Sequence, residues 1–515
     1  MSRPSRPSRL SRPARPAGPG RPSRSRRARA VLGLVAALGL AGCGGGGGSG
    51  GGGLEAGPAD WGVPSTPTTS TQALLVTLHN LAPSNATVTL TPYAYDGTPG
   101  GGAVVALDGF DSETLDFAGT PTVAWWLVST PTRTVEVAFA HTDQTGPVDE
   151  ASRAFPLGDL GAPPPVTTTS VPVVLSATTL RVTNATGAAV VVAATGYPSP
   201  VPGTDATATS VTNLPLAPFE TTLFDPDGFG VGFSGNVELS APTPFFAMVV
   251  EGTNDLAFDG VPPVTRRNRT LHADVTFGLD RAVFGGYVDF SLVLTNTSAD
   301  PRPVELRQIR RFDGTAILLA PRTISLGGHE TRAVNTMDAP LADLFGDATL
   351  AAYLTSARIE LFAPEEVNVS VRRFEPQFLT HLGTTQPQPV GHVVDVLQVW
   401  TLPSLTSGLR QWVTVHNPTP VEITVNVGIV VPQPDGFDAG PTPLPTVTVP
   451  PYGFVELSPD GVDYLDRDGL TADFVALRLT SAASFAVTGR RETRAFNGRL
   501  TRWSPLVTRT HDDAN

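Results

Sequence analysis

Residues 413–429 read VTVHNPTPVEITVNVGI, and this stretch decides the fold. A short run rich in β-branched residues ends at Asn417 and is followed by the turn-forming residues 418–420. The chain then resumes as a strand with apolar side chains at every second position: Val421, Ile423, Val425, Val427 and Ile429. Because the side chains of a strand point alternately to its two faces, this stretch predicts a β-hairpin with one face buried.

The same pattern occurs in three earlier copies, whose first runs end at Asn80, Asn184 and Asn296. Turn-forming residues and a second alternating strand follow each asparagine. An Asp-Gly turn comes after that strand in three of the four copies, at Asp96-Gly97, Asp313-Gly314 and Asp435-Gly436. Each copy has about seven short strands separated by turn signals, which is typical of a β-sandwich domain of roughly 100–120 residues.

We therefore predict an all-β fold of four tandem sandwiches, at residues 59–160, 166–262, 268–380 and 391–510. Proline-rich linkers at 162–165, 261–264 and 386–390 separate them. The pattern resembles the tandem immunoglobulin-like repeats of bacterial extracellular and surface proteins, and the resemblance implies immunoglobulin-like sandwiches. Both a rod and an arrangement in which the domains fold back on one another stay open.

The repeated asparagine has two possible roles. It could be a ligand-binding residue that the protein displays four times. Asparagine also closes turns by hydrogen bonding to the backbone two residues further along the chain. We predict the second role, because a turn follows each of the four asparagines.

The N-terminal region has the order of an export signal. Residues 1–30 hold ten arginines and no acidic residue, and an apolar run follows from Val31 to Leu40. This run is too short to span a bilayer, which needs roughly 20 residues, but it has the length of a signal-peptide core. The run ends in Leu40-Ala41-Gly42-Cys43, which contains the only cysteine of the chain.

This ending resembles the lipobox of bacterial lipoproteins. The resemblance implies cleavage before Cys43 and a diacylglyceryl and acyl lipid on its sulfur and new N-terminus. Residues 1–42 would then be the signal peptide, and residues 43–58 a glycine-rich tether. The protein would be exported and held in the cell envelope, at the outer membrane or cell surface. The alternative is a free cysteine in an ordinary secretory peptide.

Composition excludes several classes of function. The chain has 35 basic and 47 acidic residues, and the ten arginines of the leader would be lost on cleavage, so the mature protein is strongly acidic. Such a charge argues against nucleic acid as a partner, because nucleic-acid binding needs clustered Lys and Arg. With no cysteine after Cys43, disulfides and thiolate metal sites are excluded from the mature chain.

Two aspartate-rich turns are candidate calcium sites. One contains Asp225 and Asp227 before Gly228; the other contains Asp463, Asp466 and Asp468 before Gly469. Alternate aspartates can turn two carboxylates toward one hard cation, but neither run continues into an EF-hand pattern. We favour solvated turns and predict no cofactor other than the lipid. The histidines form no His-Glu-x-x-His motif and no Gly-x-Ser-x-Gly occurs in a strand-to-helix context, so we predict no catalytic activity.

The tryptophans separate two further hypotheses. Trp125 and Trp126 are adjacent, and Trp400, Trp412 and Trp503 fall in the last domain. Exposed tryptophans in line would suit a carbohydrate-binding module array, whereas buried ones would fill sandwich cores; we favour cores. We expect a structural or adhesive surface element whose partners are the membrane, through its lipid, and envelope proteins or surface glycans. A metal-dependent hydrolase with a site between domains is the second alternative.

Overall fold

The computed structural model describes residues 59–65, 72–118, 122–132, 134–143, 148–153, 155–157, 168–174, 178–251, 257–260, 269–276, 289–310, 314–318, 320–335, 356–375, 380–385, 388–400, 409–430, 442–457, 474–494 and 500–511. The predicted anchor Leu40-Ala41-Gly42-Cys43 and the aspartates Asp463, Asp466 and Asp468 lie outside these residues. The described part is built of antiparallel β-sheets that pack in pairs, which confirms the all-β sandwich class.

The first sandwich shows the plan that all four share. One sheet has the order β4 (Ala103–Leu107), β3 (Ala86–Ala94), β6 (Val123–Thr130), β1 (Ala59–Pro64) and β9 (Phe155–Pro156). The other has the order β5 (Ser112–Ala118), β2 (Gln72–Asn80), β7 (Val135–Asp143) and β8 (Val148–Arg153). Alternate side chains from the two sheets, such as Val76, Val88 and Phe139, meet in a buried core.

The second sandwich pairs the sheet β10 (Thr168–Val173), β15 (Gly235–Ser240), β12 (Val190–Pro198), β13 (Ser210–Leu216) with the sheet β14 (Thr221–Phe224), β11 (Thr178–Asn184), β16 (Phe245–Glu251), β17 (Ala257–Gly260). The third pairs β18 (Arg269–Thr276), β24 (Ser356–Ala363), β20 (Arg302–Arg310), with β21 (Ala316–Leu318) and β22 (Arg322–Leu326) both on β20, against β23 (Thr331–Asn335), β19 (Asp289–Asn296), β25 (Val367–Glu375), β26 (Thr380–Thr385). Strand β26 continues past residue 380, the predicted end of the third domain.

In the fourth sandwich one long strand, β33 (Phe474–Arg494), belongs to both sheets. Its first half pairs with β27 (Gly391–Trp400) and β29 (Ile423–Val430), and its second half with β28 (Leu409–His416) and β34 (Leu500–Pro505). The remaining strands are β30 (Thr442–Pro443), β31 (Val447–Val449), β32 (Phe454–Leu457) and β35 (Val507–Thr510). The predicted strand at 421–429 is β29, and its burial alternates as expected from Ile423 to Val427.

The strand order differs from that of an immunoglobulin constant domain, in which the sixth and seventh strands lie side by side with the third. Here the sixth strand, β6, pairs with β1 and β3, while the seventh, β7, pairs with β2 and β8 in the opposite sheet. The chain therefore crosses between sheets where an immunoglobulin domain makes a hairpin. Alternation of apolar residues specifies which face is buried but not which neighbour a strand pairs with, so the resemblance does not extend to topology.

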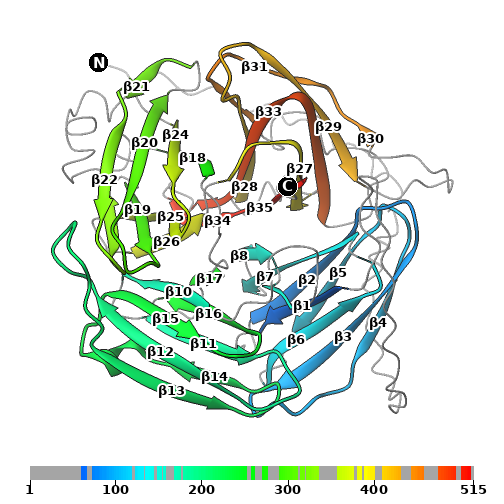
Figure 1. The fold of residues 1–515 in the computed structure, drawn as a ribbon. Coiled ribbons are helices and arrows are strands. Elements are labelled where there is room, and N and C mark those ends of the chain that lie inside the picture. Colours follow the sequence, from blue (N-terminus) through cyan, green and yellow to red (C-terminus); the bar gives the residue numbers. More distant parts are fainter. Residues whose placement is uncertain are drawn as a thin grey trace, which may run out of the picture.

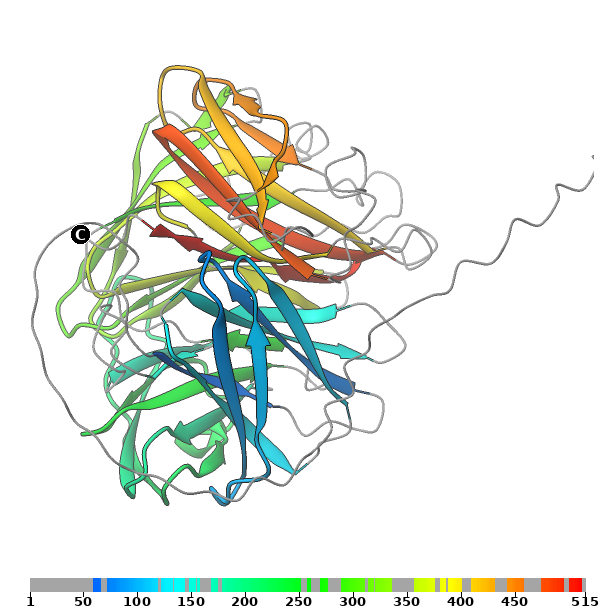
Figure 2. The ribbon, with the colours of Figure 1, turned by 90° about the vertical axis from the view of Figure 1, so that its right-hand side faces the viewer.

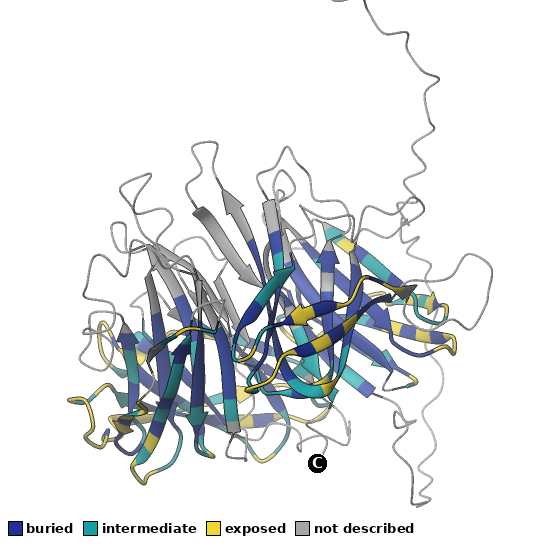
Figure 3. Cartoon of the chain, turned by 90° about the horizontal axis from the view of Figure 1, so that it is seen from above, coloured by how far each residue is buried: buried dark blue, intermediate teal, exposed yellow. Residues whose placement is uncertain are grey.

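The four sandwiches form a closed ring (Figure 1). The outer face of one sheet of each sandwich packs against the outer face of a sheet of the next, and the fourth sandwich packs against the first through Leu81, Ala138, Leu397, Val430 and Ala476. Figure 2 shows the first and fourth sandwiches side by side. The inner strands β8, β17, β26 and β34 approach one another around the centre. Exposed residues gather on the outer strands and turns (Figure 3).

Candidate functional site

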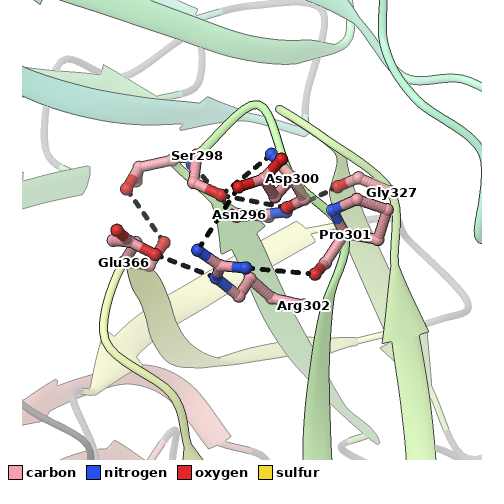
Figure 4. A network of polar contacts seen from close by, with 8 residues as sticks. Asn296, Ser298, Asp300, Pro301, Arg302, Gly327 and Glu366 are labelled. Atoms are coloured by element: carbon pink, nitrogen blue, oxygen red, sulfur yellow. Dashed lines mark hydrogen bonds and ion pairs between the residues drawn. The ribbon is translucent and has the colours of Figure 1, made fainter.

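The asparagine that ends the first run of each copy is fully buried and holds two turns together. Figure 4 shows Asn296, whose Nδ2 donates to the carbonyl oxygens of Asp300 (2.8 Å) and Gly327 (2.7 Å). Its Oδ1 accepts from the backbone N–H of Ser298, two residues on, at 3.0 Å. Equivalent bonds surround the other three: Asn80 with Ser84, Asp108 and Ala82; Asn184 with Ala188, Ala217 and Thr186; Asn417 with Val421, Pro450 and Thr419. The predicted turn-closing role is confirmed.

Replacing Asn184 with alanine is expected to lower the free energy of unfolding by about 2–3 kcal/mol, since two carbonyls and one N–H lose their partner in a buried setting. Urea denaturation followed by circular dichroism measures this loss. Asn213→Ala, on an exposed strand position, is the matched control and should change the free energy by no more than about 0.5 kcal/mol. Equal effects of the two substitutions would contradict the role given to Asn184.

The second turn that each asparagine holds presents one residue in a left-handed backbone conformation, which we call the corner residue. The four corner residues are Phe110, Phe219, His329 and Tyr452, with φ of 56°, 59°, 54° and 55°. Positive φ is uncommon for residues with a bulky side chain, so its recurrence at four equivalent places is a property of the fold. In each case the backbone N–H donates to the turn that follows the asparagine, for example from Phe219 to the carbonyl oxygen of Thr186 at 3.1 Å.

Every corner residue contacts the preceding sandwich in the ring. Phe219 stacks on Tyr93 of the first sandwich with ring centroids 4.6 Å apart, and its carbonyl oxygen accepts from Nε1 of Trp125 at 3.0 Å. His329 stacks on Tyr197 of the second sandwich at 4.1 Å. The guanidinium of Arg310 in the third sandwich lies over the ring of Tyr452 at 4.2 Å. Phe110 packs on the cluster that joins the first and fourth sandwiches, so the same position takes part in all four interfaces.

Two of the Asp-Gly turns noted in the sequence, those at Gly97 and Gly314, receive these corners, and the pair Asp435-Gly436 lies outside the described residues. Gly97 and Gly314 both have positive φ, 80° and 83°. A Cβ on Gly97 would lie 2.0 Å from the carbonyl oxygen of Pro218, and one on Gly314 would lie 2.3 Å from that of Pro451. Both carbonyls belong to the corner of the next sandwich. The glycines are therefore needed for the turn and for the approach of the neighbouring domain.

The interface between the fourth and first sandwiches, which we call the seam, is rich in buried charge. Asp395 is fully buried and accepts from Nε and Nη2 of Arg478 at 2.8 and 2.9 Å and from Nε2 of His511. Burial alone would raise the pKa of Asp395, but the hydrogen bonds and charges of Arg478 and His511 outweigh it and hold the pKa at about 2. Arg509 of β35 pairs with buried Glu136 of the first sandwich, so strand β35 links the fourth sandwich to the first.

His79 lies in the same region and is fully buried, with Nδ1 2.8 Å from the Oγ of Ser112. Burial lowers the pKa of His79 to about 3, against the opposing effect of the Asp395 charge. A histidine and a serine at hydrogen-bonding distance are also parts of a nucleophilic site. The matching positions of the second and third sandwiches hold the pairs Thr183–Thr221 and Thr295–Thr331, so the arrangement is a cross-strand contact of the fold.

The two remaining interfaces are polar in other ways. Between the second and third sandwiches, Glu330 accepts from the N–H of Gly203 at 3.0 Å and Asp205 accepts from that of Gly328 at 2.7 Å. Burial raises the pKa of Glu330, although the bonds from the backbone amides of Gly327 and Gly203 oppose the rise. Between the third and fourth, buried Arg358 donates to the carbonyl oxygen of Asn417 at 3.1 Å, and burial lowers its pKa to about 10. The same geometry thus carries different chemistry at each interface.

The described aspartates of the calcium hypothesis form a capped turn. Asp225 caps the 3-10 helix η1 (Pro226–Phe229) by accepting from the N–H of Asp227 at 2.9 Å. Asp227 in turn accepts from the N–H groups of Gly232 and Phe233 at 2.9 and 3.2 Å. One oxygen of each carboxylate is therefore bonded to backbone amides. Within the described residues no group of three His, Cys, Asp or Glu side chains is placed to hold a metal ion.

The tryptophans serve the interior. Trp61, Trp125 and Trp126 are buried, Trp125 at the interface with the second sandwich and the other two in the first core. Trp412 is half-buried beneath the guanidinium of Arg490, 4.6 Å from the ring centroid. The side chains of Trp400 and Trp503 lie outside the described part. Three of the four described tryptophans are thus closed to a sugar ring.

Sequence reasoning missed the corner residues and the seam. An aromatic or histidine residue stands in the equivalent turn of each copy, but phenylalanine, histidine and tyrosine at one position do not read as a motif until the strands are aligned in space. Among the described residues, no helix is long and apolar enough to cross a membrane. Comparison with protein-family models and with curated proteins finds no match to this chain.

Proposed function

We propose that this chain is a lipid-anchored protein of the cell envelope that acts as a structural or adhesive surface element, without catalytic activity. The observation that carries the proposal is the recurrent corner: four sandwiches use one position to dock on their neighbours and so build a ring. Buried groups that could be reactive, such as Asp395 and His79, are engaged in hydrogen bonds within their own sandwiches, to Arg478 and Ser112. A rigid body that presents outer strands and turns suits extended surface contact better than turnover of a substrate.

The N-terminal pattern supplies the location. Cleavage before Cys43 and lipidation of its sulfur and amine would attach two or more acyl chains, and two such signals hold a protein on a membrane where one does not. The nine glycines and one serine of residues 44–53 would then act as a flexible tether between the lipid and the ring. The acidic mature chain would keep the ring off anionic headgroups.

Changing Cys43 to serine is expected to move the protein from the membrane fraction to the soluble fraction of producing bacteria. Mass spectrometry of the wild-type N-terminus should find a lipidated peptide that begins at Cys43. Ser49→Ala, in the same glycine-rich segment, is the control and should leave the protein on the membrane. A wild-type chain that keeps residues 1–42, or a serine variant that stays in the membrane fraction, would contradict the anchor.

Neither alternative has an observation in its favour. The carbohydrate-binding hypothesis needs tryptophans exposed in line, and three of the four described ones are buried. The hydrolase hypothesis needs carboxylates that converge between domains without partners. Four carboxylates at the interfaces, those of Glu136, Asp395, Glu330 and Asp205, each bind a guanidinium or backbone amides.

A further inference from the structure

The outer edge strand of the first sandwich differs from those of the rest of the ring. Strand β4 (Ala103–Leu107) reads AVVAL and, among the described strands, pairs with β3 alone. Val104 is 70% exposed, and Ala106 is exposed beside it on the same face. Val105 and Leu107 point to the core. A free strand edge presents backbone N–H and C=O groups that a further strand can pair with.

Other outer strands carry a feature that discourages such pairing. The protective features are a charged residue in β5 (Glu113 and Asp116), β22 (Arg322), β23 (Arg332) and β32 (Glu456), a proline in β13 (Pro215), and a length of four residues or fewer in β14, β21, β30 and β31. Charges, prolines and short length are the usual means by which proteins blunt their sheet edges. Strand β4 has five residues and none of these features, and it lies at the periphery of the ring (Figure 1).

We propose that β4 is a docking edge for β4 of a second copy of this chain, paired antiparallel about a twofold axis at Val105. The sequence is self-complementary in this register. Val104 of one copy lies opposite Ala106 of the other, and Ala103 lies opposite Leu107, so apolar side chains meet on both faces. Sheet β4-β3-β6-β1-β9 would continue across the axis into its twin.

Charge favours this occupant and this register. The chain is acidic, with a formal net charge of −12, so most approaches of two copies bring like charges together. The nearest acid in sequence, Asp108, would lie opposite Gly102 of the second copy, and the strand itself has no charge. Two acidic rings can therefore meet at this edge without placing carboxylates directly opposite one another.

A contact of two five-residue strands is small, so the affinity in solution is expected to be weak, with a Kd on the order of 10–1,000 μM. Attachment to a membrane would raise the effective concentration of the copies and favour pairing. Only this enhancement rests on the function proposed above. Self-association itself is tested in solution without the lipid, so its failure would leave the anchor standing.

The experiment uses the full chain with Cys43→Ser, which removes the lipid and the only cysteine. Sedimentation equilibrium over a range of concentrations should show monomer and dimer. Val104→Lys and Ala106→Glu should each weaken the dimer at least tenfold, while an equimolar mixture of the two should restore it, because the introduced lysine of one copy then faces the introduced glutamate of the other. Val211→Lys, at an exposed position of β13, is the matched control and should leave the dimer intact.

Cross-linking tests the register. Single variants Val104→Cys and Ala106→Cys, in the Cys43→Ser chain, should form a covalent dimer when mixed under mild oxidation, and much less when each is alone. Unchanged circular dichroism and melting temperature verify that every variant is folded. A Cys43→Ser chain that stays monomeric up to about 1 mM (the upper limit of the range above), or cross-links that form equally well in unmixed samples, would overturn the proposal.

Discussion

Replacing Trp125 with alanine is expected to lower the free energy of unfolding by about 3–5 kcal/mol, the range found for large aromatic side chains removed from a packed interior. Trp125 is fully buried, its ring is 4.8 Å from that of Tyr93 in a stacked arrangement, and it meets Phe246 of the second sandwich edge-on at 5.6 Å. Its Nε1 also satisfies the carbonyl oxygen of Phe219, the corner residue. Urea denaturation measures the loss.

Two further variants separate the parts of this contact. Trp125→Phe keeps an aromatic ring but leaves the Phe219 carbonyl without its donor, and it should cost less than the alanine substitution. Trp412→Ala removes a half-buried tryptophan whose described contact is with Arg490, and it should also cost less. If Trp412→Ala proves as damaging as Trp125→Ala, the first-to-second interface is not the source of the effect.

Replacing Asp395 with alanine is expected to cost about 3–5 kcal/mol, because Arg478 and His511 would be left in the seam without their shared carboxylate. Hydrogen exchange should show increased exchange at β27, β35 and the strands of the first sandwich that face them, before the other three interfaces respond. Glu305→Ala is the matched control. Its ion pair with Arg307 has a similar length, 2.8 Å, but is about a third exposed or more on each side, and its loss should cost about 0–1 kcal/mol.

The response of the seam to acid distinguishes Asp395 from His79. The pKa of Asp395 is lowered in the folded protein, so its contribution is present above the ordinary value of 3.8 and is lost only as pH falls toward 2. The pKa of His79 is also lowered, to about 3, but here the folded state requires the neutral ring. Stability should therefore fall by up to about 1.4 kcal/mol per pH unit below 6.5.

The loss caused by Asp395→Ala should accordingly stay constant between pH 7 and 5 and shrink below pH 4. Urea midpoints of the wild type and the variant across this pH range measure it. A loss that disappears already near pH 6 would show that a histidine, and not the carboxylate, controls the interaction.

Much of the local structure follows from the sequence. The alternation at 421–429 predicts β29, and the turn after each asparagine predicts the hydrogen bond two residues on. Both are short-range effects, decided by residues a few positions apart. The Asp-Gly pair at 96–97 predicts the turn that the structure has there, although its second role against a neighbouring corner is not visible in the sequence.

The topology and the ring could not be predicted for a different physical reason. The alternation of apolar residues is the same whether β6 pairs with β7 or lies in the opposite sheet. The choice depends on which pairing satisfies the backbone hydrogen bonding of all the strand edges at once. The rings of the corner residues Phe219 and His329 stack on another sandwich. Packing of this kind depends on the side chains of two surfaces, and the sequence of one strand specifies only one of those surfaces.

Because the corner of every sandwich points to its predecessor, all four contacts have the same sense of rotation and join unlike faces. Head-to-tail contacts of this type grow into fibres unless the rotation closes on itself. Here the rotation closes after four steps, within one polypeptide. Each sandwich then has both docking faces covered, the one that carries its corner residue and the one that contacts the corner residue of the next sandwich. Sheet stacking is thereby capped at a fixed number, and further growth by that route is blocked.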